Sequence, residues 1–289
     1  MSLMTKVLVS DPIDQVGIDI LSQVAQVDKH VGLSIDDLKQ IIGKYEALMI
    51  RSGTQVTEEV INQASKLRII GRAGVGVDNV DVPSATKKGI LVVNSPGGNT
   101  IAAAEHAVAM LLALSRNIPQ AHASMVSGDW QRKKFVGNEL YKKVLGVVGL
   151  GKIGSHVAKV ANAMGMEVVA FDPFVSADRA QQMQVRLSQI EDLFKNADYV
   201  TLHLPRTPET ENLVDFEMLS SMKPNARLVN CARGGIINET DLAKALNSQI
   251  IAGAAIDVYA KEPLADDSPL RSVENGLILT PHLGASTKE

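Results

Sequence analysis

The segment from Lys143 to Asp172 constrains the fold more than any other part of the chain. A short apolar run leads into three glycines, Gly149, Gly151 and Gly154. A helical pattern and a second apolar run follow, and an acid closes the segment. This order predicts strand, turn, helix and strand, the unit that binds dinucleotides. The glycines permit the tight turn, the approach of backbone to a pyrophosphate and close helix packing. An ordinary glycine-rich turn is the alternative, but the agreement of all four elements favours a dinucleotide.

The acid that closes this segment predicts which dinucleotide is bound. Asp172 can accept hydrogen bonds from a ribose 2′-OH but would repel a 2′-phosphate. Pro173 and Phe174 follow it, where a phosphate-pairing arginine would otherwise stand. The sequence therefore predicts NAD rather than NADP as the cofactor.

Short β-like runs alternate with helical patterns along the whole chain, which predicts an α/β fold with doubly wound parallel sheets. We expect two domains, residues 1–97 and residues 98–289. The expected strands are 6–10, 47–50, 68–71, 90–93, 199–203, 226–230, 254–258 and 277–279, and the expected helices include 14–23, 34–42 and 57–65.

Between the two expected domains, residues 95–99 break the pattern with a Pro-Gly-Gly sequence that is either a hinge or a plain loop. Residues 100–115 follow as a helix that is apolar on nearly every face. A helix without a polar side belongs in an interior. We therefore expect a buried connector between two lobes.

Composition excludes several classes of protein. A net charge of −3 and few aromatic residues give no basic stripe for nucleic acid. No apolar stretch reaches membrane-spanning length and no signal peptide opens the chain, so we expect a cytoplasmic protein without a membrane partner. The single cysteine excludes an internal disulfide and a cysteine-rich metal site. We expect no metal, and a small molecule as the substrate.

Three residues after predicted strands carry the most chemistry. Arg233, in NCARGG, can hold a carboxylate with a planar fork and polarise a neighbouring carbonyl. Glu262 precedes a proline, and His282 lies in TPHLG. If the two meet, the carboxylate fixes the imidazole tautomer and raises its pKa, which makes a general acid or base. The set predicts a hydride-transfer site.

Each of these residues alone has a plainer interpretation as a surface arginine, a turn glutamate or a structural histidine. Their common placement at strand ends favours the catalytic one. We interpret His106, His122 and His156 as structural, because they lie in helical patterns without strand-end placement. His203, in HLPRT, ends a strand and is expected to shape the cofactor pocket.

Five blocks, VGLGKIG with Asp172, LHLPRTPET, NCARGGIIN, AAIDVYAKEP and TPHLGAST, resemble the D-isomer-specific 2-hydroxyacid dehydrogenases in order and spacing. The resemblance covers almost the whole chain. It implies a Rossmann-type NAD-binding domain and a smaller, flavodoxin-like substrate-binding domain. It also implies Arg233, Glu262 and His282 as catalytic residues.

The resemblance implies further contacts residue by residue. The implied cofactor-binding residues are Gly149, Gly151, Lys152, Ile153, Gly154, Asp172, His203, Thr207, Cys231, Asp257 and Gly284. The implied substrate-binding residues are Arg51, Ser52, Gly53, Arg72, Val75, Gly76 and Arg132. Arg132 begins a basic run with Lys133 and Lys134, for which a solvated helix face is the alternative. Lys152 departs from the arginine of many relatives, which keeps the charge but loses the fork.

The segments RSGTQVT, GRAGVGVDNVD and GDWQRKKFVG are most similar to family members that act on a phosphorylated substrate. The implied activity is the NAD-dependent oxidation of 3-phospho-D-glycerate to 3-phosphohydroxypyruvate, the first step of serine biosynthesis. A glyoxylate or hydroxypyruvate reductase, another D-2-hydroxyacid dehydrogenase, or a non-catalytic NAD-sensing protein are the alternatives. The resemblance also implies a homodimer or higher homo-oligomer through the NAD domain. Members continue past the position of residue 289 through a helix that returns to the first domain, and we expect this return helix to be absent here.

Overall fold

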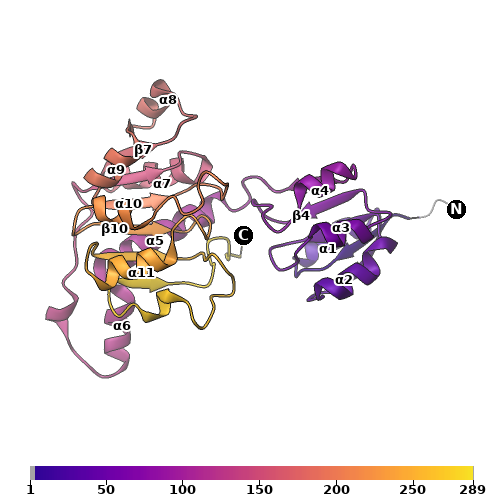
Figure 1. The fold of residues 1–289 in the computed structure, drawn as a ribbon, viewed down its shortest axis with the longest axis horizontal. Helices are drawn as coiled ribbons and strands as arrows, with labels where there is room; N and C mark the ends of the chain where they lie inside the picture. Colours follow the sequence, from indigo (N-terminus) through magenta and orange to yellow (C-terminus); the bar gives the residue numbers. More distant parts are fainter. Residues whose placement is uncertain (1–3, 289) are drawn as a thin grey trace. The chain divides into compact units, whose positions relative to one another are not determined.

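The computed structural model describes residues 4–288, which form two compact units divided between Gly98 and Asn99 (Figure 1). Each unit is built on a parallel sheet with flanking helices. The predicted fold class is therefore confirmed. The sequence placed the domain boundary between residues 97 and 98, and substrate binding by the first unit stays a prediction.

In the first unit, the described residues form one five-stranded sheet in the order β2-β1-β3-β4-β5. This is the strand order of the flavodoxin-like doubly wound fold. The strands are β1 (Lys6–Val9), β2 (Gln26–Lys29), β3 (Ala47–Ile50), β4 (Ile69–Arg72) and β5 (Leu91–Asn94), and the helices are α1 (Gln15–Ser22), α2 (Ile35–Ile41), η1 (Ile42–Lys44), α3 (Glu58–Gln63) and α4 (Val82–Lys87).

Side-chain caps set where the helices of the first unit begin. Asp14, Ser34, Thr57 and Asp81 each accept a hydrogen bond from a backbone N–H in the first turn of the helix that follows. Such a cap stabilises a helix by about 1 kcal/mol. At Ser34, for example, the side-chain Oγ accepts from the Asp37 nitrogen at 3.1 Å. The caps leave the apolar faces of these helices free to cover the sheet.

In the second unit, the described strands form a seven-stranded sheet in the order β12-β11-β10-β9-β6-β7-β8. Read from the other end and with β6 counted as strand 1, the order β8-β7-β6-β9-β10-β11 is the 3-2-1-4-5-6 order of dinucleotide-binding folds. The strands are β6 (Val144–Val148), β7 (Glu167–Phe171), β8 (Arg186–Leu187), β9 (Tyr199–Leu202), β10 (Arg227–Asn230), β11 (Gly253–Ile256) and β12 (Leu277–Leu279). The helices are α5 (Thr100–Arg116), α6 (Ile118–Val126), η2 (Arg132–Phe135), α7 (Lys152–Ala163), α8 (Ala177–Gln182), α9 (Ile190–Asn196), α10 (Phe216–Ser221), α11 (Glu239–Asn247) and η3 (Pro269–Ser272).

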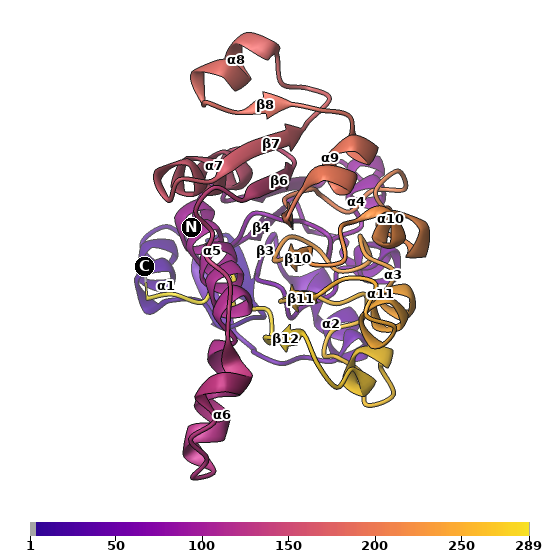
Figure 2. The ribbon, with the colours of Figure 1, turned by 90° about the vertical axis from the view of Figure 1, so that its left-hand side faces the viewer.

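Helices cover both faces of this second sheet. Figure 2 shows α5 and α7 on one face and α9, α10 and α11 on the other. One core cluster joins α5 and α7 to the sheet, and a second joins α9, α10 and α11 to its opposite face. Strands covered on both sides read as nearly continuous apolar runs, and every residue of β9 is buried, Thr201 included. Full burial of one such side chain contributes roughly 1.5 to 3 kcal/mol.

Helix α5 differs from its prediction. It packs one stripe against α7 and the sheet through Ala107, Met110 and Leu114, which are buried. Ile101 on the opposite stripe is 51% exposed. The expectation of a helix without an exposed side was therefore wrong, because apolar composition does not require that every face have a partner within the chain.

Asn117 separates α5 from α6 with a left-handed backbone conformation, φ 52°. Figure 2 shows α6 extending away from the sheet of its own unit, and none of its residues is buried. Within residues 4–288, no single helix is long and apolar enough to cross a membrane; α5 and α6 pass that test only as a pair, with a 63° bend between them.

Candidate active site

The carboxyl ends of the parallel strands form one edge of the second sheet, and polar residues gather there. Gly149, Asp172, His203, Asp257 and Thr280 directly follow β6, β7, β9, β11 and β12. Ligands of open parallel sheets bind at this edge. The sequence prediction that strand-end residues share one edge is confirmed by the strand order and direction.

The glycine turn is packed at its ends and open at its centre. Gly149 has φ 97°, and a Cβ there would lie 2.6 Å from the His203 carbonyl oxygen. A Cβ on Gly154 would collide with the Gly149 carbonyl. In contrast, a Cβ on Gly151 would meet nothing within 4 Å, and Gly151 is the residue that precedes α7. The loop therefore leaves space at the start of a helix, where a pyrophosphate can accept from backbone N–H groups.

Asp172 supports this turn from the end of β7. Its Oδ2 accepts a hydrogen bond from the Leu150 nitrogen at 2.7 Å, and its Oδ1 accepts one from the Phe174 nitrogen at 2.9 Å. Each carboxylate oxygen can accept a second bond. The residue predicted to bind the ribose thus also fixes the glycine loop, a role that its position in the sequence did not reveal.

His203 packs against the glycine turn. Its Nε2 lies 3.0 Å from the Thr201 hydroxyl, and burial lowers its pKa to about 4. The imidazole is therefore neutral at neutral pH. A neutral ring beside the turn adds no cation to the cofactor site and fits a shaping role.

The Arg233 loop is held by the last residue of β10. The Asn230 side chain is buried, accepts from the Ala232 nitrogen at 3.0 Å and donates to the Arg233 oxygen at 3.0 Å. A Cβ on Gly234 would collide with the Tyr259 carbonyl, so this loop packs closely on the one that follows β11. The guanidinium of Arg233 donates to the Ala232 oxygen at 2.6 Å.

Glu262 and His282 meet, as the sequence predicted. The Nδ1 of His282 lies 2.7 Å from Oε2 of Glu262, and the other carboxylate oxygen accepts from the Tyr259 nitrogen at 3.1 Å. The hydrogen bond that His282 donates to Glu262 raises the pKa of His282 above its ordinary value, against the opposing effect of burial. Burial alone would raise the pKa of Glu262, but the bonds from His282 and Tyr259 hold it below its ordinary value.

Arg233 lies within electrostatic range of this pair, because its charge acts to lower the pKa of His282. The imidazole side chain is 44% exposed and the Glu262 side chain 38%. The outward nitrogen Nε2 is therefore free of the carboxylate and reachable from solvent. A guanidinium, an imidazole with tuned basicity and an open strand edge can hold an anion and move one proton.

Asp257 fixes the segment that carries His282. Its carboxylate is fully buried and accepts from the Thr280 hydroxyl at 2.5 Å, the Leu283 nitrogen at 2.8 Å and the Gly284 nitrogen at 2.9 Å. These bonds lie on both sides of residue 282. His282 itself has φ 55°, a left-handed conformation that is uncommon outside glycine.

His106, which we interpreted from the sequence as structural, contacts the predicted cofactor residue Asp257. Its Nε2 lies 3.2 Å from Asp257 Oδ1. Because a carboxylate only accepts, this nitrogen carries the proton. The helical pattern around His106 indicates which face of α5 the residue occupies. It does not indicate that this face lies against Asp257, the residue after β11, so no signal in the sequence could have found the contact.

Ligand atoms of His106, Cys231 and Asp257 lie within 4.8 Å of one another in the described part of the chain. Both oxygens of Asp257 already accept hydrogen bonds, and burial raises the pKa of the Cys231 thiol, which keeps it protonated. A metal would need the thiolate. The cluster is explained as a hydrogen-bond network around Asp257.

The remaining predicted cofactor residues lie along the same edge. Lys152 and Ile153 open α7, and Gly284 donates to Asp257. Thr207 lies in the loop after β9, where its nitrogen donates to the Thr210 hydroxyl at 2.8 Å. Arg132 lies apart from them, exposed on η2.

The other predicted substrate residues lie in the first unit, at the carboxyl ends of the neighbouring strands β3 and β4. Arg51, Ser52 and Gly53 follow β3 and are exposed, and Arg72 ends β4. Val75 and Gly76 lie in the loop that follows β4. The side chain of Asn94, the last residue of β5, donates to the Val75 oxygen at 2.6 Å. The structure thus brings these six residues to one edge of the first sheet.

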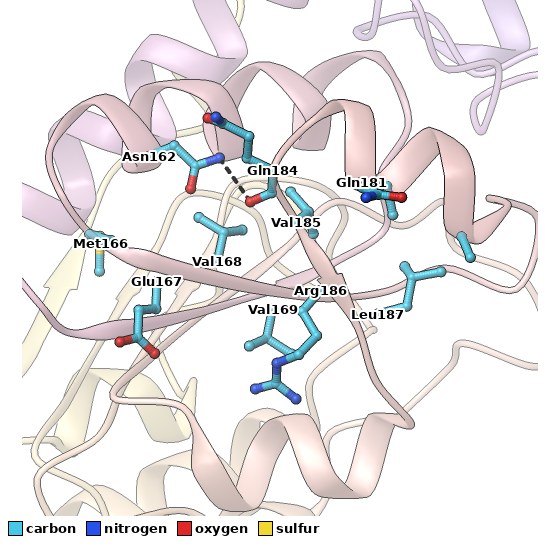
Figure 3. Close-up of a pocket in the computed structure, with 12 residues that line it drawn as sticks. Asn162, Met166, Glu167, Val168, Val169, Gln181, Gln184, Val185, Arg186 and Leu187 are labelled. Atoms are coloured by element: carbon cyan, nitrogen blue, oxygen red, sulfur yellow. Dashed lines mark hydrogen bonds between the residues drawn. The ribbon is translucent and has the colours of Figure 1, made fainter.

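A cavity of about 680 Å³ lies elsewhere in the second unit, beside β7 and β8 (Figure 3). Glu167, the first residue of β7, lines it together with Arg186 of β8. The Asn162 side chain donates to the Gln184 oxygen at 3.3 Å at its rim. The cavity lies at the β8 edge of the sheet and is lined by none of the predicted site residues.

Residues 108–284 match the model of the D-isomer specific 2-hydroxyacid dehydrogenase, NAD binding domain. The chain belongs to this family. The predicted resemblance and the predicted NAD-binding domain are both confirmed, and the glycine turn with its open centre is the part of that domain that fits the cofactor.

Relatives in this dehydrogenase family include curated proteins named D-3-phosphoglycerate dehydrogenase. The one from Synechocystis is 61% identical over 286 residues, which are 99% of this chain and 51% of that protein. The one from Methanocaldococcus jannaschii is 49% identical and is matched over 99% of this chain and 54% of its own length. The chain therefore spans about half the length of the curated relatives it matches.

Several solved structures have the same fold as this chain. The TT0316 protein from Thermus thermophilus matches with a TM-score of 0.89 and 34% identity, over 98% of this chain and 91% of that one. NAD-dependent formate dehydrogenase from Staphylococcus aureus in complex with NAD matches with a TM-score of 0.87 and 30% identity, over 98% and 90%.

Proposed function

We propose that the chain carries the catalytic machinery of an NAD-dependent dehydrogenase that oxidises 3-phospho-D-glycerate to 3-phosphohydroxypyruvate. The observation that carries this proposal is the contact of 2.7 Å between His282 and Glu262 at the strand edge that bears the glycine turn. The identity of 61% to a relative named for this activity supports the choice of substrate.

The residues divide the chemistry as follows. Bound NAD supplies a hydride acceptor. The exposed Nε2 of His282 takes the hydroxyl proton, and Glu262 stabilises the imidazolium that results. Arg233 holds the substrate carboxylate and polarises the oxygen that becomes a carbonyl. Asp172 selects NAD over NADP because a 2′-phosphate would meet its negative charge.

The loops of the first unit supply the remaining substrate contacts in this proposal. Arg51, Ser52 and Gly53 after β3, with Arg72, Val75 and Gly76 after β4, offer side-chain cations and backbone N–H groups for a carboxylate and a phosphate. Arg132 offers a further cation. The groups after β3 and β4 support the assignment of substrate binding to the first unit, and the open glycine turn supports that of cofactor binding to the second.

Substrate choice is tested by following NADH formation with 3-phosphoglycerate and with glycerate. We expect kcat/KM to be higher for the phosphorylated acid by at least about tenfold, since one charge-assisted contact contributes about 1.5 to 3 kcal/mol. Equal values for the two acids would overturn the phosphate specificity. Tight NADH binding without turnover of any 2-hydroxyacid would favour an NAD-sensing protein.

We also propose that the second unit forms a homo-oligomer with further copies of the chain. Helix α6 buries none of its residues, and Val126 and Trp130 are 74% and 81% exposed. Neighbouring exposed apolar side chains of this size are typical of protein interfaces. Light scattering on the purified chain should give the mass of a dimer or a higher oligomer, and Trp130→Ser with Val126→Ser should lower it. Val24→Ser, at an exposed site in the first unit, is the control.

A further inference from the structure

A buried carboxylate lies beneath the Arg51 loop of the first unit. Asp11 follows β1 and is only 4% exposed. Its Oδ2 accepts from the Arg51 nitrogen at 2.6 Å and from the Thr54 nitrogen at 3.0 Å, and its Oδ1 accepts from the Thr54 hydroxyl at 2.9 Å. One side chain therefore holds both ends of the four-residue loop that follows β3.

Asn79 holds the same loop through its carbonyl groups. Its Nδ2 donates to the Arg51 oxygen at 2.7 Å and to the Thr54 oxygen at 2.7 Å. At both residues the backbone N–H is thus bound by Asp11 and the backbone C=O by Asn79. The two side chains thus bind four main-chain groups of a turn, which no neighbouring strand binds.

The donors around Asp11 explain why a carboxylate is required there. Two N–H groups and one hydroxyl converge on its two oxygens, and a carboxylate only accepts. An asparagine of the same shape would carry one accepting oxygen instead of two and no negative charge, so it would bind these groups more weakly. Gly53 fits the same arrangement, because a Cβ at that position would lie 2.7 Å from Asp11 Oδ1.

The loop combines a fixed backbone with free side chains. Arg51 and Ser52 are exposed, while the carboxylate beneath them is buried. A binding loop whose backbone is fixed before the ligand arrives loses less conformational entropy on binding. We propose that Asp11 and Asn79 are positioning residues that hold the Arg51–Thr54 loop in the conformation that binds the anionic substrate. This inference rests on the proposed function for the role of the loop, and on the hydrogen bonds above for the role of the two residues.

Hydrogen exchange tests the positioning without reference to catalysis. In the whole chain, Asp11→Asn should accelerate exchange of the Arg51 and Thr54 amides, whose acceptor it removes or weakens. Asp14→Asn is the matched control, because that carboxylate caps α1 through Val16 and an asparagine caps about as well. Unchanged protection of the Arg51 and Thr54 amides in Asp11→Asn would overturn the proposal.

Steady-state kinetics with 3-phosphoglycerate tests the consequence for binding. Asp11→Asn and Asn79→Ala should each raise KM by about tenfold to a hundredfold, since a displacement of about 1 Å has effects of that size. NADH affinity should stay unchanged, because both residues lie in the first unit. A variant whose first unit failed to fold would lose amide protection throughout that unit, including the strands β1, β3 and β4, whereas a displaced loop loses protection at Arg51 and Thr54 alone.

The two arms separate this inference from the proposed function. If the unsubstituted chain does not turn over 3-phosphoglycerate, the proposed function fails, and the exchange arm still decides whether Asp11 holds the loop. If the unsubstituted chain is active and Asp11→Asn leaves KM unchanged, the positioning role is overturned while the proposed function stands.

Discussion

The Nε2 atom of His106, on α5, lies 3.2 Å from Oδ1 of Asp257, which follows β11. His106→Phe keeps a ring of similar size but leaves a fully buried carboxylate without one of its donors. We expect the free energy of unfolding to fall by about 1 to 3 kcal/mol. Urea unfolding followed by circular dichroism measures the loss.

Two further variants make that measurement specific to the contact. His106→Gln keeps an N–H donor on a side chain of comparable reach and should lose less stability than His106→Phe. His122→Phe, at an exposed site on α6, should change stability by less than about 0.5 kcal/mol. Equal losses in the phenylalanine and glutamine variants would show that packing, and not the hydrogen bond, accounts for the effect.

Glu262→Gln should move the pH dependence of turnover. Glu262 raises the pKa of His282, so the amide should let that pKa fall toward its ordinary value. Oxidation needs the neutral imidazole, and the rising limb of kcat/KM should therefore shift to lower pH. Reduction needs the imidazolium, and its falling limb should shift in the same direction. A profile that keeps its position in both directions would contradict the assignment of His282 as the acid and base.

The contact between His282 and Glu262 also makes the free energy of unfolding depend on pH. The contribution of protonated His282 is fully present below the pKa of an unfolded histidine and is lost as pH rises through its raised folded pKa. The contribution of Glu262 is present above the pKa of an unfolded glutamate and is lost as pH falls through its lowered folded pKa. Melting temperatures across this range should differ less in Glu262→Gln than in the unsubstituted chain.

Two glycine variants should separate cofactor binding from folding. The methyl group added in Gly151→Ala would lie more than 4 Å from any neighbouring atom, so the melting temperature of this variant should stay unchanged. The methyl group would occupy the space left for the pyrophosphate, so NADH binding should weaken. Gly154→Ala collides with the Gly149 carbonyl and should lower the melting temperature. Thermal unfolding with and without NADH measures both. Undiminished stabilisation of Gly151→Ala by NADH would show that the open space is not the pyrophosphate site.

Asp172→Ala should weaken NADH binding by about tenfold to a hundredfold, the effect of losing a charge-assisted hydrogen bond of about 1.5 to 3 kcal/mol. The affinity for NADPH should fall less than that for NADH. Both cofactors lose the loop support that the bond from Leu150 to Asp172 provides, but the 2′-phosphate of NADPH is also relieved of its repulsion by the carboxylate. Fluorescence titration gives both affinities. An unchanged ratio of the two affinities would remove Asp172 from cofactor selection.

Patterns along the sequence predicted the elements with two buried faces and the residues that end them. Prediction was harder where a strand is short or lies at an edge: β2, at the edge of the first sheet, buries none of its residues, and β8 has two residues. Neither carries enough apolar side chains to produce a pattern. Helix α4 was missed because its six residues include Pro83 and few apolar side chains.

The candidate site was predictable where it depends on strand ends and not where it depends on packing. Arg233, Glu262 and His282 follow apolar runs, and the parallel topology brings such positions to one edge. The contact of His106 with Asp257, and that of Asp11 with the Arg51 loop, join elements whose faces only the packed structure defines. Hydrogen-bond partners of this kind leave no periodic signal.

The left-handed backbone at His282 limits how the acid and base can be removed by mutation. Asparagine occupies that region readily, whereas valine or isoleucine would strain the chain there. His282→Asn is thus the informative inactive variant: its turnover should fall by about 10² to 10⁴-fold with NADH affinity retained. A β-branched replacement would mix lost chemistry with a deformed loop, and screens that rank substitutions at this position by activity alone would confuse the two.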